Sequence, residues 1–250
     1  AWFAQKFAVE TNPLQGKIEA ALPGANCGVC GYPGCSGLAA QIVKGEAPVS
    51  SCPVGGPAVW GIIAQLTGKN EEKLIARRAA LICQGDKNTV QQLGDYRGIR
   101  DCRAASVLGV SFRGCVYGCL GLGTCEKVCP FDALYMNEET DLPEIDWEKC
   151  TGCGKCVKVC PRGVLVLTSD MEQVQVACHS PAAGKDVRLI CKKGCIKCQL
   201  CVKTCPVGAI SSVDGMIKID QEKCTRCDLC IEKCPTSSIV YLGKKAVSVA

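Results

Sequence analysis

The sequence predicts an α+β protein made of a small helical N-terminal module followed by two tandem modules of short helices and strands. Three observations lead to this fold class. The 250 residues include 24 cysteines and 27 glycines but only four phenylalanines, too few large apolar side chains for one extensive core. The cysteines lie in runs of fixed spacing that recur along the chain. Proline follows the last cysteine of each of these runs.

The clearest run lies between residues 150 and 161. It consists of Cys150, Cys153, Cys156 and Cys160, with Pro161 after the last cysteine. Two-residue gaps let one tight loop place three thiolates around an iron–sulfur cubane, while the fourth cysteine binds the neighbouring cluster. The run therefore predicts [4Fe–4S] ligands of the bacterial ferredoxin type. Zinc is the alternative, because paired CxxC units also hold a tetrahedral ion, but zinc needs neither the further cysteines nor the proline.

Residues 115–170 form the first predicted ferredoxin-like unit, in which this run is paired with an earlier one that ends at Pro130. Because the fourth cysteine of each run serves the other cluster, the ligand sets cross over. The predicted sets are Cys115, Cys119, Cys125 and Cys160 for one cluster, and Cys129, Cys150, Cys153 and Cys156 for the other. The gaps of the earlier run are wider than usual, and its glycines permit the larger turn that these gaps require.

Residues 195–242 form the second predicted ferredoxin-like unit, and both of its runs keep the usual spacing. The predicted sets are Cys195, Cys198, Cys201 and Cys234 for one cluster, and Cys205, Cys224, Cys227 and Cys230 for the other. The segment 212–219 predicts a β-hairpin with Asp214-Gly215 as its turn. Each unit is thus expected to have the fold of a bacterial-type 2[4Fe–4S] ferredoxin.

Residues 23–84 are predicted to form a small helical [4Fe–4S] domain. Its predicted ligands are Cys27, Cys30, Cys35 and Cys52, and a four-cysteine zinc site is the alternative. Apolar periodicity and glycine or proline stops predict helices over 12–21, 36–44, 57–67 and 70–84. Ser36 and Asn70 are the expected N-caps of the second and fourth helices. The fourth helix is expected to pack on the first module through Ala79, Leu81 and their apolar neighbours.

Four cysteines belong to no run: Cys83, Cys102, Cys178 and Cys191. Four is the number that one cubane needs, so they are predicted to share a sixth [4Fe–4S] cluster besides the five assigned above. This cluster would order the two linkers, 85–114 and 171–194, which would otherwise be long loops with little structure. It would also bridge the N-terminal cluster and the ferredoxin-like units. The alternative is four buried or free thiols.

Charge and motif content exclude other function classes. The formal net charge of +5 counts cysteines as neutral, whereas an oxidised cubane with four thiolates carries about −2. Six clusters would bring the chain to about −7, so nucleic acid is not an expected partner. The sequence has no Walker loop, dinucleotide fingerprint or nucleophile–base pair, and His179 is expected in a solvent-facing or core role. No catalytic residue is therefore predicted, and the thiols indicate a reducing compartment.

The order of the modules resembles a known family. The loop Cys27-Gly-Val-Cys30-Gly-Tyr-Pro-Gly-Cys35, the pair Cys52-Pro53 and the runs that end at Pro130 and Pro161 follow one another as in the RnfB family. Members of that family are the iron–sulfur subunits of Rnf membrane complexes. These complexes are ferredoxin:NAD⁺ oxidoreductases that couple electron flow to the translocation of Na⁺ or H⁺. The second ferredoxin-like unit makes the chain similar to the longer type, found in clostridia and Thermotogales.

The resemblance implies an electron-transfer subunit with no active site of its own beyond electron transfer. It implies reduced soluble ferredoxin as the donor, and the other membrane, flavin and iron–sulfur subunits of the complex as partners. It places the chain at the cytoplasmic face of the cell membrane. Residues 1–22 would then follow an N-terminal membrane helix not included in this sequence, and residues 243–250 would be a tail. The alternatives are a polyferredoxin subunit of a soluble hydrogenase or dehydrogenase, and a structural zinc protein.

Ferredoxin is expected to dock on the second ferredoxin-like unit. Bacterial ferredoxins are acidic, so an acceptor should present basic residues near an exposed cluster. The candidates are Lys192, Lys193, Lys197, Lys203, Lys223, Arg226 and Lys233.

Overall fold

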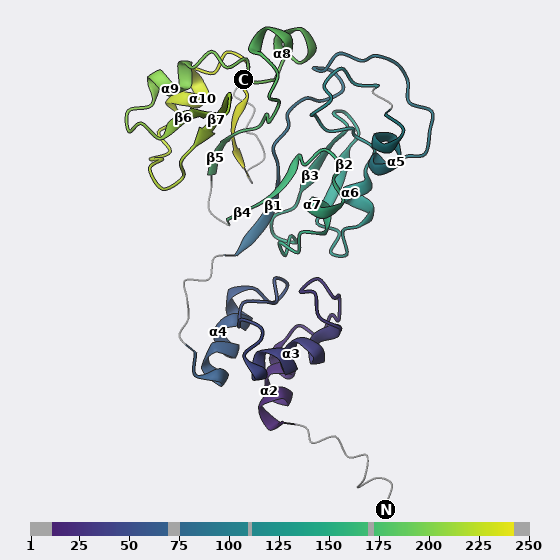
Figure 1. Cartoon of the computed structure of the whole chain (residues 1–250), viewed down its shortest axis with the longest axis vertical. Helices are drawn as coiled ribbons and strands as arrows, with labels where there is room; N and C mark the ends of the chain where they lie inside the picture. Colours follow the sequence, from purple (N-terminus) through teal and green to yellow (C-terminus); the bar gives the residue numbers. More distant parts are fainter. Residues whose placement is uncertain (1–11, 70–75, 110–111, 170–172, 243–250) are drawn as a thin grey trace, which may run out of the picture. The chain divides into compact units, whose positions relative to one another are not determined.

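The computed structural model describes residues 12–69, 76–109, 112–169 and 173–242. The chain forms two compact units, residues 1–77 with 151–153, and residues 78–150 with 154–250 (Figure 1). The first half of the predicted juxtamembrane segment, the expected cap at Asn70 and the tail 243–250 lie outside the described residues.

The first unit contains the helices α2 (Pro13–Ala21), α3 (Gly34–Lys44) and α4 (Gly56–Thr67). Asn12 caps α2, because its Oδ1 accepts the N–H of Leu14 at 2.9 Å. The buried faces of the helices meet in one core around Ile18, Leu38 and Ile63. The helices predicted over 12–21 and 57–67 are therefore confirmed to within one residue.

The predicted cap of α3 is wrong. The helix begins at Gly34 rather than at Ser36, and Pro33 precedes it without a capping side chain. The first turn of the helix is capped by a residue from the preceding loop, because Oδ1 of Asn26 accepts the N–H of Cys35 at 2.7 Å. A β-carbon at Gly34 would lie 2.8 Å from that same oxygen, so this close approach requires glycine.

The second unit consists of two halves with the same order of elements: a strand, two helices, two strands, a helix and a strand. The first half contains β1 (Arg77–Leu81, of which Arg77 belongs to the first unit), α5 (Cys102–Val107), α6 (Thr124–Lys127), β2 (Leu134–Asn137), β3 (Leu142–Ile145), α7 (Lys155–Val159) and β4 (Leu165–Ser169). The second half contains β5 (Gln173–Val176), α8 (Gly184–Ile190), α9 (Leu200–Thr204), β6 (Ile210–Val213), β7 (Met216–Ile219), α10 (Leu229–Glu232) and β8 (Ile239–Leu242).

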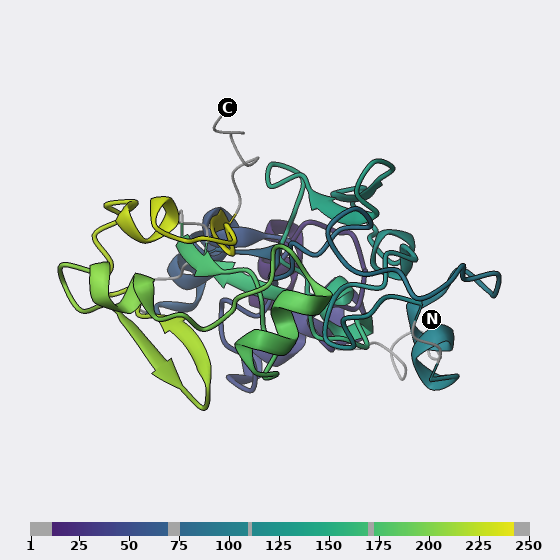
Figure 2. The same cartoon turned by 90° about the horizontal axis from the view of Figure 1, so that it is seen from above.

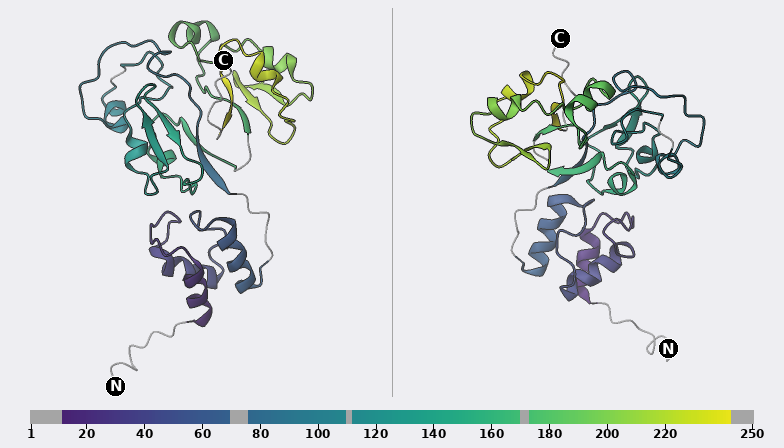
Figure 3. Two further views of the ribbon diagram at one scale, coloured as in Figure 1. Left: turned by 180° about the vertical axis from the view of Figure 1, so that it is seen from behind. Right: turned by 45° about the horizontal axis from the view of Figure 1, so that its top comes forward.

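The strands pair in the same way in both halves (Figure 3). The inner strands β2 and β3, like β6 and β7, form antiparallel hairpins. The outer strands pair β1 with β4, and β5 with β8. Each half has its own core, built around Leu134 and Leu165 in the first half and around Val174 and Ile217 in the second. The predicted hairpin over 212–219 is confirmed, and Asp214 and Gly215 have the positive φ that its turn requires.

The helix predicted over 70–84 is wrong in its described part. Residues 77–81 form β1, and the N–H of Ile82 continues the pairing by donating to the carbonyl of Val164 at 2.8 Å. Ala79 and Leu81 lie in the core of the first ferredoxin-like half, against the predicted packing on the first module. Pairing with a strand more than 80 residues away overrides the local preference for helix.

In each half, a segment is inserted between the first strand and the first cluster-binding loop. These inserted segments are residues 82–114 and 177–194. They pair with each other: the N–H of Gln91 donates to the carbonyl of Ile190 at 2.8 Å, and that of Lys192 to the carbonyl of Thr89 at 2.9 Å. Helix α8 and the loop after it, in green in Figure 2, therefore join the two halves.

Candidate iron–sulfur sites

One backbone geometry recurs in the three loops with cysteines at two-residue gaps, 150–156, 195–201 and 224–230. The residues on either side of the middle cysteine have positive φ: Gly152 and Gly154, Lys197 and Gln199, Arg226 and Asp228. A short helix begins directly after the second of these residues in each loop: α7 at Lys155, α9 at Leu200 and α10 at Leu229. Two left-handed residues turn the chain around the middle cysteine, as a loop wrapped around one cubane requires.

The structure brings together the first predicted set of the second half. Its members Cys195, Cys198, Cys201 and Cys234 line one pocket with Val176, Ile217 and Ile239. Burial raises the pKa of Cys201 to about 11, and the charges of the other three thiols act in the same direction. Four thiols around an apolar cavity fit a cubane, whose iron converts neutral thiols into thiolates.

The other set of the second half is also brought together. Burial raises the pKa of Cys230 to about 11, and the charges of Cys224, Cys227 and Cys205 add to the shift. Two candidate ligand sulfurs in this half accept equivalent backbone N–H groups, Cys205 from Ala209 and Cys234 from Ser238, both at 3.3 Å. Such hydrogen bonds to sulfur tune the reduction potential of a cluster.

In the first half, one predicted set is largely found in the core. Cys129, Cys150 and Cys156 pack there with Leu134, and the N–H of Ala79 donates to the sulfur of Cys150 at 3.4 Å. Cys153 is half-buried in the loop that precedes α7. Strand β1 therefore contacts the candidate ligand Cys150 directly, a role that the predicted helix did not include.

Two cavities contain the remaining thiols of the second unit. Cys102, Cys119, Cys125 and Cys160 line one cavity. Cys83, Cys115, Cys178 and Cys191 line another, which His179 also borders. Relative to the sets predicted from the sequence, Cys102 and Cys115 have exchanged places. Within the described ranges, no three His, Cys, Asp or Glu side chains lie close enough together to hold a single metal ion. The thiols of these two sets are instead spaced around cavities.

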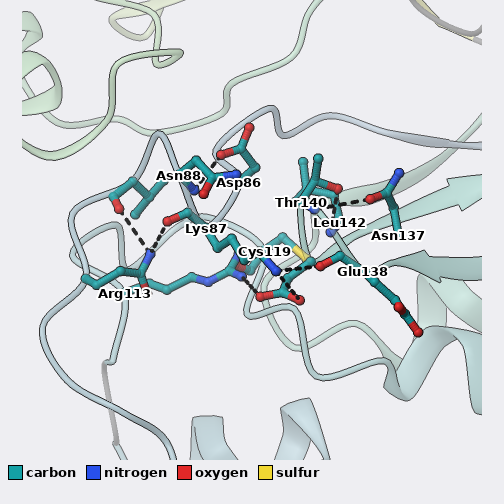
Figure 4. A network of polar contacts seen from close by, with 12 residues as sticks. Asp86, Lys87, Asn88, Arg113, Cys119, Asn137, Glu138, Thr140 and Leu142 are labelled. Carbon is teal, nitrogen blue, oxygen red and sulfur yellow. Dashed lines mark hydrogen bonds and ion pairs between the residues drawn. The ribbon is translucent and has the colours of Figure 1, made fainter.

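The segment before Cys115 is held in place by a polar network (Figure 4). The guanidinium of Arg113, 3% exposed, donates to the carbonyl of Cys119 at 3.0 Å and lies 3.5 Å from the carboxylate of Asp141. The N–H of Lys87 donates to the carbonyl of Thr140 at 3.0 Å. These contacts fix the inserted segment 82–114 to the turn between β2 and β3. They thereby position Cys115, the residue that follows this segment.

The candidate ligands of the first unit are Cys27, Cys30, Cys35 and Cys52. Cys52 is part of the helical core, and Cys30 and Cys35 pack against that core. Burial raises the pKa of Cys52, and the charges of Cys30 and Cys35 contribute. The indole Nε1 of the buried Trp60 donates to the carbonyl of Cys52 at 2.6 Å, so α4 positions the last of these candidate ligands.

The substitution Trp60→Phe is expected to lower the free energy of unfolding by about 1–3 kcal/mol, because it leaves the buried carbonyl of Cys52 without its donor. Denaturation of the iron-loaded chain, followed together with iron release, measures the effect. Trp147→Phe, at a half-buried tryptophan of the second unit, is the control. An equal decrease in the free energy of unfolding of the two variants would show that the hydrogen bond from Trp60 to the carbonyl of Cys52 does not stabilise the first unit.

Four family models match the chain, and all describe iron–sulfur domains. They are FeS (Fe–S cluster) over residues 22–54, Fer4_3 (4Fe-4S binding domain) over 115–133, Fer4 (4Fe-4S binding domain) over 143–166, and Fer4_7 (4Fe-4S dicluster domain) over 194–238. The chain thus has tandem ferredoxin-type domains, and its cofactors are several [4Fe–4S] clusters. The zinc alternative is set aside.

The most informative relatives are RnfB-type subunits that are similar over most of the chain. One is the subunit of this type from the ion-translocating oxidoreductase complex of Methanosarcina acetivorans, 45% identical over 87% of the chain and 82% of the relative. The chain belongs to the RnfB family. It is also 44% identical to the corresponding subunit of the proton-translocating ferredoxin:NAD⁺ oxidoreductase complex of Clostridium ljungdahlii, over 88% of the chain and 78% of the relative.

A third RnfB-type relative comes from the Na⁺-translocating ferredoxin:NAD⁺ oxidoreductase complex of Acetobacterium woodii. It is 44% identical over 88% of the chain, which spans 66% of the relative's length. The family resemblance seen in the sequence is therefore confirmed, and it favours a subunit of an ion-translocating complex over a soluble hydrogenase or dehydrogenase. Within the part of the chain that the structure describes, no helix is long and apolar enough to cross a membrane.

Proposed function

We propose that this chain is the electron-transfer subunit of an ion-translocating ferredoxin:NAD⁺ oxidoreductase complex. It accepts electrons from reduced ferredoxin and relays them through [4Fe–4S] clusters to the other subunits. The carrying observation is the 44–45% identity to RnfB-type subunits over 87–88% of the chain. The clusters supply one-electron chemistry when bound, and the protein supplies their spacing, their hydrogen bonds and a docking surface.

Six clusters are proposed, which would use all 24 cysteines. The first unit would hold one cluster on Cys27, Cys30, Cys35 and Cys52. Three further sets are Cys129, Cys150, Cys153 and Cys156; Cys195, Cys198, Cys201 and Cys234; and Cys205, Cys224, Cys227 and Cys230. The hydrogen bonds and cavities described above support these sets. The same proposal includes attachment to the cytoplasmic face of the membrane through a helix that precedes residue 1, and contact with the membrane, flavin and iron–sulfur subunits.

Electrons are proposed to enter through the second ferredoxin-like half. Of the 24 cysteines, Cys198 and Cys227 are the two that are exposed, and both belong to this half. Basic side chains lie next to them, including Lys197 and the exposed Arg226. An exposed ligand indicates that the cluster lies near the surface, where a weak and fast redox encounter needs only a small contact area. Basic residues around it would attract an acidic ferredoxin.

Charge reversal at Lys192 and Lys193 is expected to slow the reduction of the chain by reduced ferredoxin about 10-fold at low salt, because it removes electrostatic steering. Stopped-flow absorbance of the iron–sulfur clusters measures the second-order rate constant. The effect should reside in that constant and should shrink as ionic strength rises. The first-order electron transfer that follows should be unchanged.

The matched control reverses Lys17 and Lys44, two exposed lysines of the first unit. This variant has the same net charge as the test variant, so it separates local steering from overall charge. Equal slowing in both variants, or a rate constant that ignores ionic strength in the wild type, would refute docking on the second half. A chain that ferredoxin does not reduce at all would refute the proposed function.

A further inference from the structure

The loop from Cys119 to Cys125 has the backbone of a cluster-binding loop but lacks its middle thiol. Gly121 and Gly123 both have φ of 74°, like the residue pairs around the middle cysteine in the three regular loops. Helix α6 begins directly after Gly123, as α7 begins after Gly154. The residue between the two glycines is Leu122, which is 7% exposed. A leucine thus occupies the place of the middle ligand, and the loop itself supplies only two thiols.

Cys102 lies where the missing thiol is needed. It is the first residue of α5, whose N-cap Asp101 accepts the N–H groups of Arg103 and Ala104. The N–H of Cys102 donates to Oγ1 of Thr124 at 2.6 Å, next to the ligand Cys125. Cys102 also packs against the small core that contains Leu122. It therefore borders the same cavity as Cys119, Cys125 and Cys160.

Cys115 faces the other cavity, together with the thiols that follow the first strand of each half. Cys83 lies two residues after β1, and Cys178 lies two residues after β5. The residue before each cysteine donates a hydrogen bond to the residue that precedes the partner strand, which is β4 in the first half and β8 in the second. The N–H of Ile82 bonds the carbonyl of Val164 at 2.8 Å, and that of Ala177 bonds the carbonyl of Ser238 at 2.7 Å. Cys83 and Cys178 are thus structural equivalents in the internal repeat.

The fourth thiol of this cavity is placed by the pairing of the inserted segments. Cys191 forms an antiparallel bridge with Val90. A β-carbon at Gly85 would lie 3.3 Å from the sulfur of Cys191 and 3.8 Å from that of Cys83. One at Gly118 would lie 3.4 Å from the sulfur of Cys115 and 3.6 Å from that of Cys83. Two glycines therefore leave room around the sulfurs of three cysteines.

We propose that Cys102 and Cys115 exchange roles relative to their order in the sequence. One cluster is held by Cys102, Cys119, Cys125 and Cys160, and a sixth by Cys83, Cys115, Cys178 and Cys191. The proposal rests on the proposed function only in that the clusters are [4Fe–4S]. Each thiol loses its proton as its sulfur bonds one iron, so each site uses four thiolates.

The sixth cluster would connect the two ferredoxin-like halves. On one side, the sulfur of Cys83 accepts the N–H of Cys119, a ligand of the first half, at 3.5 Å. On the other side, burial raises the pKa of Cys195, a ligand of the second half, and the charge of Cys178 adds to the shift. Lys193 lies between Cys191 and Cys195 in the chain, and its carbonyl accepts a hydrogen bond from the hydroxyl of Ser238 at 2.9 Å. Electrons could therefore pass between the halves through this site.

Paired substitutions test the ligand sets by iron content. Cys115→Ala with Cys178→Ala removes two ligands from one site, so iron and acid-labile sulfide should each fall from about 24 to about 20 per chain. Cys102→Ala with Cys178→Ala damages two sites, so both should fall to about 16. Two pairs calibrate the assay: Cys224 with Cys227 from one site, and Cys195 with Cys224 from two. The reverse order, or equal losses in the two test pairs, would overturn the proposal.

A rescue experiment tests the same ligand sets by a gain of iron rather than by its loss. Leu122→Cys creates the regular spacing of three cysteines at two-residue gaps and should make Cys102 dispensable. The double variant Cys102→Ala with Leu122→Cys should then contain about 24 irons, while Cys115→Ala with Leu122→Cys should stay below the wild type. Rescue of the Cys115 variant, or failure to rescue the Cys102 variant, would overturn the proposal. Slow reduction by ferredoxin at full iron content would count against the proposed function alone.

Discussion

Removal of iron by a chelator under reducing conditions is expected to unfold most of the second unit of the chain. Its helices have four to seven residues and its strands four or five, lengths that are not stable without tertiary contacts. Candidate ligand cysteines are built into the cores of both halves, among them Cys150 and Cys156 in the first half and Cys201 and Cys230 in the second, so each core depends on its clusters. Binding of the clusters therefore supplies most of the folding free energy.

Far-UV circular dichroism and amide proton exchange, recorded before and after chelation, measure this loss. Reconstitution of the same sample with iron, sulfide and thiol should restore both signals, which serves as the control against irreversible damage. Buried thiols are also kept neutral without metal, since burial raises the pKa of Cys191 to about 11 and that of Cys125 to about 12. An apo chain that keeps the exchange protection of the loaded chain would contradict this account of stability.

The substitution Gly184→Ala is expected to have the second largest effect. A β-carbon at this position, the first residue of α8, would lie 1.9 Å from the carbonyl oxygen of Ile196. Ile196 lies between the proposed ligands Cys195 and Cys198, so the clash would displace their loop. Backbone atoms cannot move aside as the end of a flexible side chain can. We therefore expect the substitution to lower the free energy of unfolding by about 3 kcal/mol. Iron should fall by about four per chain as the site opens.

Gly94→Ala is the matched control for this variant. Gly94 lies in the inserted segment of the first half, has no positive φ, and its added β-carbon would meet nothing within 4 Å. Thermal denaturation and iron analysis of both variants compare the same chemical change in a crowded and an open place. If Gly184→Ala matched Gly94→Ala in both measurements, the close contact between α8 and the ligand loop would be refuted.

The sequence predicts best where a cluster imposes its own spacing. The loops 195–201 and 224–230 could be placed from their cysteines and prolines alone, because two-residue gaps leave few ways to surround a cubane. The hairpin over 212–219 followed from its Asp-Gly turn. The helices around Ile18 and Ile63 follow from apolar periodicity and from glycine or proline stops.

The predictions that failed depend on contacts between distant residues. The local sequence of residues 77–81 predicts helix, but pairing with the distant strand β4 makes this segment a strand. The cap of α3 comes from Asn26, nine residues before Cys35. The place of Leu122 could have been found in the sequence, because Cys119 and Cys125 are spaced like Cys150 and Cys156, with glycines at the same offsets. Nothing local, however, indicates that Cys102 lies beside this loop, since tertiary packing brings it there.

The most direct test of the electron relay is a titration of the anaerobically purified chain with reduced ferredoxin, followed by visible absorption and electron paramagnetic resonance. We expect the broad absorption to bleach and each chain to take up about six electrons, one for each [4Fe–4S] cluster. A chain that contains its full iron but takes up no electrons from ferredoxin would contradict the central claim.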